Sequence, residues 1–87
     1  MPYQVQILPS ALETLRLIPK KFRAQIGRKI DRLANNPFPP DCTKLETTEH
    51  LYRVRVGDYR ILYTVDKQAI VVTIVKVGDR KDVYRRL

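Results

Sequence analysis

The sequence has few of the residues that stabilise small secreted or metal-dependent proteins. Among its 87 residues it has one cysteine, Cys42, one histidine, His50, and no tryptophan. A single thiol cannot form an internal disulfide, and one thiol with one histidine cannot supply the ligands of a Cys-based zinc site. We therefore expect a protein of a reducing compartment, and we expect no cofactor.

Long apolar segments are also missing. The longest apolar stretch, Ala69–Val75, is interrupted by Thr73, and it is far shorter than the roughly 20 residues that a membrane-spanning helix needs. The N-terminus opens with alternating apolar and polar residues and lacks the basic-then-apolar layout of a signal peptide. These absences predict a cytoplasmic protein without a membrane partner.

Positive charge is what the sequence has in excess. It holds 17 Lys+Arg against 9 Asp+Glu, for a formal net charge of +8. Such an excess favours a polyanionic partner, which could be RNA, DNA, an anionic membrane or an acidic protein. The length predicts one domain over residues 1–87, with a modest core, because a chain this short buries only about 60% of its unfolded surface.

The stretch Leu51–Tyr63 predicts a β-hairpin around which the sheet is built. Gly57 and Asp58 stand at the centre of the turn, where glycine adopts a positive φ at little cost. Pairing outward from this turn places Arg55 opposite Arg60. The alternation then sends one set of side chains to a buried face: Tyr52, Val54, Val56, Tyr59, Ile61, Tyr63 and Val65.

The other face of the predicted hairpin carries three arginines. Arg53 lies two residues from Arg55 and therefore on the same side of the strand, beside Arg60. Like charges opposite one another destabilise a strand pair by roughly a few tenths of a kcal/mol, and no acid of these two segments is on that face. An anionic ligand would explain the cluster, and ordinary solvated charges on an exposed sheet are the alternative.

Before the hairpin the sequence predicts a strand and two helices. Tyr3–Ile7 alternates and predicts the strand, the capping box of Ser10 and Glu13 predicts a helix start, and Pro19 ends that helix. The second helix is expected from about residue 20 to 35. The side chains expected to be buried are Leu12, Leu15, Phe22, Ile26, Ile30 and Leu33.

After the hairpin, Asp66–Ala69 predicts a turn and Ile70–Val77 the last strand. Pairing residue 65 with residue 70 would send Val71, Thr73 and Val75 to the arginine side, and Ile70, Val72 and Ile74 to the core. The fold class is therefore α+β: an N-terminal strand, a two-helix hairpin and a three-strand antiparallel meander. The helices cover one face of a curved sheet, the arginine side stays open, and residues 79–87 form a short basic tail.

The run YRVRVGDYRILYTV followed by VTIVKVGDRKDVYRRL closely resembles the RelE toxins of the RelE/ParE superfamily. The predicted order of elements matches that family over the whole chain. The resemblance implies the toxin of a type II toxin–antitoxin pair, a metal-independent endoribonuclease that cuts messenger RNA in the ribosomal A site by 2′-hydroxyl attack. It implies as partners the ribosome, mRNA and a cognate antitoxin with an acidic segment, with operator DNA bound only through the antitoxin complex.

The resemblance also implies site residues. Arg60 corresponds to the family's phosphate-stabilising arginine, Arg80 to its arginine after the last strand, and Tyr84 to its tyrosine near the C-terminus. Arg53 and Arg55 occupy positions that are lysines in the best-known members, and these five residues form the implied catalytic set. The implied RNA-binding residues are Arg53, Arg55, Arg60, Lys76, Arg80 and Lys81.

The chemistry of this cleavage assigns different roles to arginine and tyrosine. A guanidinium offers a planar fork of donors that fits the phosphate oxygens of a dianionic transition state. With a pKa above about 12, however, arginine is a poor general base. Tyr84, whose ordinary pKa near 10 would be lowered by neighbouring guanidiniums, is the better candidate for the base or for a proton relay.

Two other functions are compatible with the sequence. A ParE-like inhibitor of a topoisomerase such as gyrase would share the fold but would not require the arginines and Tyr84 as a set. A non-catalytic nucleic-acid-binding module would need the arginines but not Tyr84. The basic residues of the second predicted helix are expected to form a solvated face, with contact to ribosomal RNA as the alternative.

Overall fold

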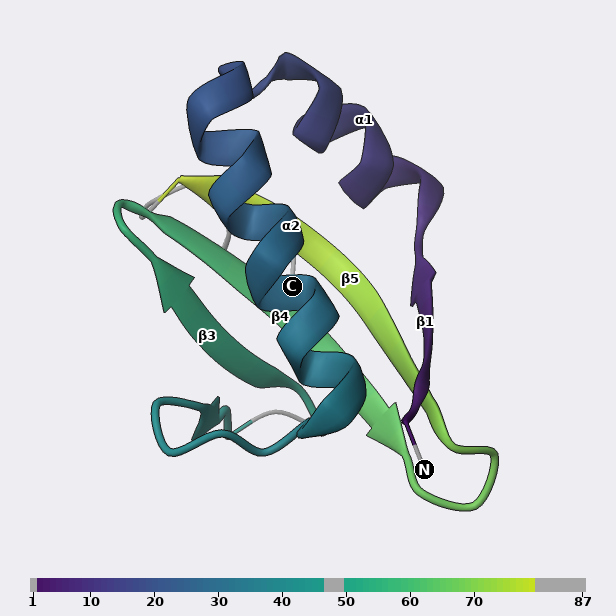
Figure 1. The fold of residues 1–87 in the computed structure, drawn as a ribbon. Helices are drawn as coiled ribbons and strands as arrows, with labels where there is room; N and C mark the ends of the chain where they lie inside the picture. Colours follow the sequence, from purple (N-terminus) through teal and green to yellow (C-terminus); the bar gives the residue numbers. More distant parts are fainter. Residues whose placement is uncertain (1, 47–49, 80–87) are drawn as a thin grey trace.

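The structure is a computed structural model that describes residues 2–46 and 50–79. Two helices lie on one face of a five-stranded sheet with the strand order β1-β5-β4-β3-β2 (Figure 1). This is the predicted α+β arrangement with one strand more. The elements are β1 (Gln4–Ile7), α1 (Pro9–Leu17), α2 (Lys20–Asn35), β2 (Thr43–Lys44), β3 (Tyr52–Val56), β4 (Tyr59–Asp66) and β5 (Val71–Asp79).

The meander of β3, β4 and β5 is antiparallel, and β1 joins it by pairing parallel to β5, with Ile7 opposite Ile74. The prediction of a meander extended by the N-terminal strand is confirmed. The short edge strand β2 was not predicted. It pairs Thr43 with Arg53, and two residues are too few to show an alternating pattern, so β2 exists because β3 offers it an edge.

Helix α1 does not begin with the predicted capping box. Its N-cap residue is Leu8, which makes no side-chain cap hydrogen bond, and Pro9 occupies the first turn. Proline suits that position because its fixed φ is already helical and its missing N–H has no intrahelical acceptor there. Ser10 lies inside the helix, where its carbonyl accepts a hydrogen bond from Thr14 Oγ1 at 3.1 Å. Pro19 separates the helices as predicted, and α2 covers the predicted residues 20–35.

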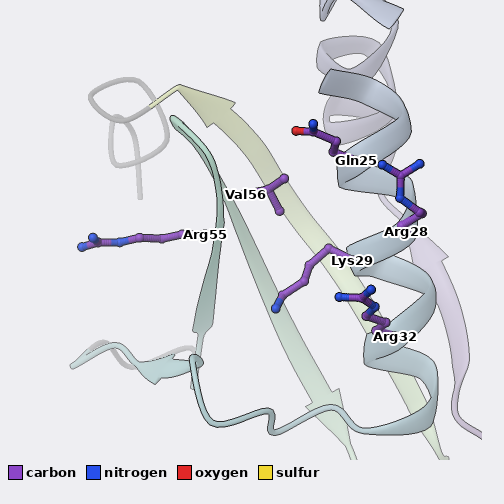
Figure 2. A pocket seen from close by; sticks show the side chains of 6 residues that line it. All are labelled: Gln25, Arg28, Lys29, Arg32, Arg55 and Val56. Carbon is purple, nitrogen blue, oxygen red and sulfur yellow. The ribbon is translucent and has the colours of Figure 1, made fainter. Parts of the chain in front are cut away.

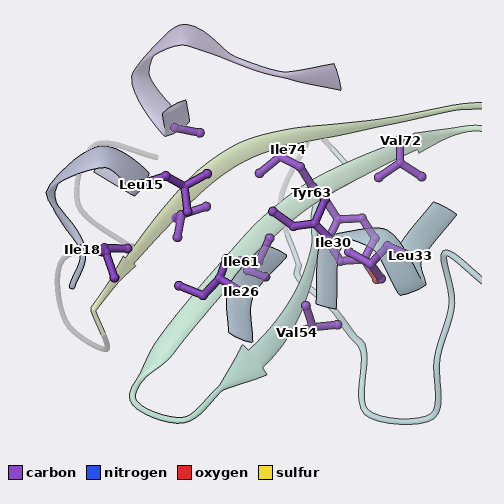
Figure 3. Packing of buried hydrophobic residues seen from close by; sticks show 12 residues of the cluster. Leu15, Ile18, Ile26, Ile30, Leu33, Val54, Ile61, Tyr63, Val72 and Ile74 are labelled. Carbon is purple, nitrogen blue, oxygen red and sulfur yellow. The ribbon is translucent and has the colours of Figure 1, made fainter. Parts of the chain in front are cut away.

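The core forms between the helices and the inner face of the sheet (Figure 3). Leu12 and Phe22 were expected there, but they are 41% and 37% exposed. The buried residues of α1 are Ala11 and the predicted Leu15, so Ala11 takes the core position that was expected for Leu12. The described core residues are Ala11, Leu15, Ile18, Ile26, Ile30, Leu33, Val54, Ile61, Tyr63, Val72, Ile74 and Val77.

The tyrosines of the hairpin lie on the core face, as predicted. Tyr63 is fully buried and its hydroxyl donates a 2.8 Å hydrogen bond to the carbonyl of Pro37. Burial raises the pKa of Tyr63, so this hydroxyl stays protonated and remains a donor. Tyr52 stacks on it with ring centroids 5.8 Å apart. The pair holds the proline-rich connection after α2 against the sheet.

The predicted register between β4 and β5 is wrong. Val65 faces Val72, not Ile70. The turn is shifted by one residue toward the C-terminus, because Asp66 pairs with Val71 and its Oδ1 accepts hydrogen bonds from the backbone N–H groups of Gln68 (3.0 Å) and Ala69 (2.9 Å). Ile70 therefore lies in the turn with a φ of 59° and is 39% exposed, so it does not join the core.

A β-bulge interrupts the same strand pair. Tyr63 faces Ile74 while its neighbour Leu62 faces Lys76, so Val75 is the extra residue on β5. Val71 and Thr73 lie on the side of Thr64 and Asp66, as predicted, but beyond the bulge the sides exchange. Lys76 consequently lies on the arginine side, opposite Leu62, and Gly78 holds the position opposite Arg60 that the predicted register gave to Val75.

None of the helices among the described residues is long and apolar enough to cross a membrane.

Two glycines give a matched test of this backbone. A Cβ built on Gly57 or on Gly27 meets no atom within 4 Å, but Gly57 has a φ of +58° and Gly27 lies in α2. We expect Gly57→Ala to lower the free energy of unfolding by about 1 kcal/mol through left-handed strain. Gly27→Ala should raise it by about 0.8 kcal/mol through helix propensity. Urea denaturation measures both, and shifts of the same sign would contradict the assignment.

Candidate nucleic-acid interface

The sheet surface that carries Arg53, Arg55 and Arg60 is called the arginine face here. The β3–β4 register places Arg55 directly opposite Arg60 and Arg53 opposite Leu62, which confirms the predicted pairing. In Figure 2 the side chain of Arg55 extends from β3 away from α2, whose labelled side chains lie on the other side of the strand. The described helices therefore do not cover the arginine face.

The three arginines differ in exposure. Arg55 is exposed and Arg53 is half-buried, with its Nη2 donating to Thr43 Oγ1 at 3.3 Å. Arg60 is only 8% exposed, so it is not an ordinary solvated surface charge. A guanidinium removed from water is stable only where its surroundings compensate it. The position of Arg60 is therefore set by the fold and not by solvent.

The arginine face is less open than the sequence suggested. Leu62, which lies on it, is fully buried. Leu62 has Arg53 directly opposite on β3 and Lys76 directly opposite on β5. The long aliphatic stems of such residues cover apolar surface while their charged ends reach outward. Arg60 and Leu62 also belong to β4, the central strand, which has neighbours on both sides.

Lys76 is the fourth cation of the arginine face, and the bulge puts it there. The resemblance alone implied a role for Lys76 in RNA binding, since unbroken alternation would have turned it toward the core. The sequence does carry a signal for the change: Val72 and Ile74 are core residues two apart, and the next core residue is Val77, three further on. A shift from even to odd spacing in a strand indicates a bulge between them.

Three of the predicted site residues, Arg80, Lys81 and Tyr84, lie outside the described residues, and their roles stay predictions. The described chain ends with Gly78 opposite Arg60 and Asp79 opposite Tyr59. Strand β5 thus leads to the Arg60 end of the arginine face.

A second cationic surface lies on the helix side of β3. A groove of about 270 Å³ is lined by Gln25, Arg28, Lys29, Arg32, Arg55 and Val56 (Figure 2). Lys29 Nζ is 2.7 Å from Asp41 Oδ2, and this hydrogen bond holds the pKa of Asp41 below its usual value. The α2 cations were expected to form a solvated face, and Lys29 departs from that by being paired.

Among residues 2–46 and 50–79, no group of three or more His, Cys, Asp or Glu side chains is placed to hold a metal ion.

The fold and the cationic sheet define a small basic α+β protein, and comparison with known proteins gives its family. The family model of the ParE toxin of the type II toxin–antitoxin system parDE matches residues 5–84. The chain belongs to this family, within the RelE/ParE superfamily of type II toxin–antitoxin toxins.

Individual relatives agree with this assignment. The chain is 32% identical to the toxin RelE of Mycobacterium tuberculosis over 85 residues, 97% of this chain and 88% of that protein. It superposes on the archaeal RelE–RelB complex of Pyrococcus horikoshii OT3 with a TM-score of 0.83 and 34% identity, covering 94% and 99% of the two chains. The isolated Escherichia coli RelE toxin gives a TM-score of 0.78 and 26% identity, with 94% and 90% covered.

The Lys29–Asp41 pair predicts a pH-dependent contribution to stability. Because the pKa of Asp41 is lowered in the folded state, the pair stabilises above the ordinary value of 3.8, and this contribution is lost as the pH falls through the folded value. Asp41 is half exposed, so we expect Asp41→Asn to cost at most about 1 kcal/mol at pH 7. Denaturation across pH 7 to 2 should show wild type and variant converging in acid. A difference that is constant with pH would rule out the pair as its cause.

Proposed function

We propose that this toxin is an endoribonuclease that cuts messenger RNA in the A site of the ribosome, without a metal, and thereby inhibits translation. The observation that carries the proposal is the placement of Arg60: a nearly buried guanidinium in the central strand, directly opposite Arg55 and beside Arg53 and Lys76. Four cations on one sheet face, uncovered by the described helices, suit a phosphate backbone. The proposal places the protein in the cytoplasm, with the ribosome and mRNA as partners.

The four cations would act in two ways. Arg60, held by its burial, would stabilise the charge that develops on the phosphate as the 2′-hydroxyl attacks, since a preorganised donor needs no reorganisation during the reaction. Arg53, Arg55 and Lys76 lie at the edges of the same face, and they would bind the flanking phosphates and position the strand. In this proposal the arginine face supplies positive charge, and no general base is assigned to it.

Proton transfer would fall to residues after β5. Tyr84 is proposed as the general base or proton relay, and Arg80 as a second group that stabilises the transition state. The support for this is the end of β5 beside Arg60, where Gly78 faces it across the strand pair, together with the motif that the sequence shares with RelE toxins.

Cleavage of translated messages tests the proposal. Discrete cuts at A-site codons, mapped by primer extension, are expected for the wild type, and the cleavage rate should fall about 100- to 1,000-fold in Arg60→Ala. Arg60→Lys, which keeps the charge but loses the planar fork, should fall between the two. Tyr84→Phe and Arg80→Ala should also lose the cuts.

The matched control for Arg60→Ala is Arg16→Ala. Arg16 lies on α1 with a 64% exposed side chain and a 3.5 Å ion pair to Glu13, so this variant removes the same charge from a different surface and should cleave normally. Thermal melts of each variant check that it is folded. Unchanged cleavage by a folded Arg60→Ala protein would overturn the proposed role of the arginine face.

Inhibition of a topoisomerase is the second candidate, because the family model that matches is that of ParE toxins. The two candidate functions are distinguished by whether messenger RNA or DNA supercoiling is affected. A gyrase inhibitor would block DNA supercoiling in vitro and leave messages whole, whereas the proposed nuclease would cut messages and leave supercoiling unaffected.

We also propose a cognate antitoxin as partner, supported by the solved complex of archaeal RelE with RelB. The cationic groove beside α2 and the net charge of +8 favour an acidic antitoxin segment. Co-expression should restore growth to cells that produce this protein. Because exposed ion pairs are screened by salt, the complex should dissociate faster at 0.5 M than at 0.1 M NaCl. Harmless expression of the protein alone would contradict the toxin assignment, and a salt-independent dissociation rate would contradict the acidic segment.

A further inference from the structure

A second hollow lies at the far end of the β3–β4 pair from the Gly57 turn, and neither the arginine face nor the cationic groove includes it. Its volume is about 570 Å³, and its lining includes Phe38, His50, Tyr52, Thr64, Lys67 and Gln68. We call it the aromatic pocket. These residues come from the proline-rich connection, the start of β3, the end of β4 and the turn before β5, so only the fold brings them together.

Two half-buried rings form its wall. Phe38 and Tyr52 meet edge to face, with centroids 5.1 Å apart and an interplanar angle of 70°. Tyr52 is backed by the fully buried Tyr63, on which it stacks, and the Tyr63 hydroxyl bonds to the carbonyl of Pro37, the residue before Phe38. Contacts with Tyr63 therefore fix both rings in place, so their side chains do not have to be ordered when a ligand binds.

Polar and charged groups lie around the rings. Lys67 Nζ is 5.1 Å from the centroid of the Phe38 ring, close enough for a cation–π contact. The turn that carries Lys67 and Gln68 is held by Asp66 Oδ1, which accepts from the Gln68 and Ala69 N–H groups. His50 is exposed and has a left-handed φ of 54°, an uncommon conformation outside glycine that costs on the order of 1 kcal/mol.

The aromatic pocket lies at the edge between the two faces of the sheet, where β4 extends past the start of β3: its Thr64 is on the arginine side of β4, whereas its Tyr52 packs against the core on the other side. Thr64, which lines the pocket, follows Leu62 on the same side of the strand, and Leu62 lies opposite Arg53. Arg60 and Thr64 are four residues apart on β4, which is about 13 Å along a strand. A single strand of RNA with one phosphate at Arg60 can therefore run past Arg53 to Thr64, and a base beyond that point would turn over the sheet edge to meet the rings of Phe38 and Tyr52.

We propose that the aromatic pocket binds an unpaired base of single-stranded RNA. Aromatic side chains with an adjacent cation suit this ligand, because every base has a face that stacks and a phosphate beside it. Phe38 and Tyr52 supply the stacking surface, Lys67 the contact to the neighbouring phosphate, and Gln68 with His50 the hydrogen bonds to the base edge. That the RNA is the message being cut rests on the function proposed above, whereas base binding itself does not.

The matched control is another half-exposed phenylalanine with the same kind of surroundings. Phe22 lies 5.6 Å from the Tyr59 ring, as Phe38 lies 5.1 Å from Tyr52, and Lys21 Nζ is 5.8 Å from its centroid. It does not line the aromatic pocket. Comparing Phe38→Ala with Phe22→Ala therefore removes one ring from the pocket and one equivalent ring from elsewhere.

The experiment titrates purified protein with a short oligoribonucleotide that contains 2-aminopurine, whose fluorescence is quenched by stacking. The wild type should quench it, and Phe38→Ala should bind about 5- to 100-fold more weakly, while Phe22→Ala binds like the wild type. An oligonucleotide with an abasic site in place of 2-aminopurine should bind the wild type as weakly as the intact one binds Phe38→Ala. Lys67→Gln, a surface change that leaves the core intact, should reduce the salt dependence of log Kd by about 0.7.

Equal losses in Phe38→Ala and Phe22→Ala, or abasic RNA that binds as tightly as intact RNA, would overturn the pocket. So would an unchanged salt dependence in Lys67→Gln, or saturation by an acidic peptide with no binding of RNA. The outcome of this experiment is independent of the outcome of the cleavage assay. Phe38-dependent quenching without message cleavage would support base binding by the aromatic pocket and contradict the proposed nuclease activity. Message cleavage without Phe38-dependent quenching would support the nuclease activity and contradict base binding by the pocket.

Discussion

The structure depends on the register of the β3–β4 pair. Side chains alternate across a sheet, so a slip by one residue would exchange the two faces of the hairpin. Val54, Ile61 and Tyr63 would then leave the core, where they are fully buried, and the arginines would enter it. Gly57, with its positive φ, sets the turn from which the pairing counts. The burial that stabilises the fold and the exposure that creates a cationic surface are therefore two results of one register.

The cationic residues are divided between two surfaces by the sheet itself. Arg53, Arg55, Arg60 and Lys76 belong to one face, while Arg28, Lys29 and Arg32 of α2 lie on the helix side. Within the arginine face the residues are not equivalent. Arg60 is nearly buried in the central strand, and Arg53 and Lys76 lie opposite the buried Leu62 on the two neighbouring strands. The arginine face thus combines one guanidinium held by burial with outer cations that can adjust to a ligand. This arrangement suits a phosphate backbone, because the outer cations can position the strand while the fixed guanidinium stabilises the charge at one phosphate.

Irregular features of the backbone place several polar groups at the arginine face and at the aromatic pocket. The bulge at Val75 brings Lys76 to the arginine face, and the turn capped by Asp66 presents Lys67 and Gln68 beside the rings of Phe38 and Tyr52. The hydrogen bond from Tyr63 to the carbonyl of Pro37 ties the proline-rich connection to the sheet and so fixes Phe38. The bulge interrupts regular pairing and the turn holds Ile70 at a positive φ, and both place polar groups at the surface.

The sequence by itself determined the hairpin, its register, the arginine pairing, the span of α2 and the order of the meander. These depend on local signals: a glycine turn, strict alternation, and proline boundaries that interrupt both periodicities. Tertiary structure decided the edge strand β2, the burial of Ala11 in place of Leu12, the bulge that redirects Lys76, and the near burial of Arg60. Those outcomes depend on which segments meet in space, because a side chain's exposure and a strand's partner are set by neighbours that the local pattern does not specify.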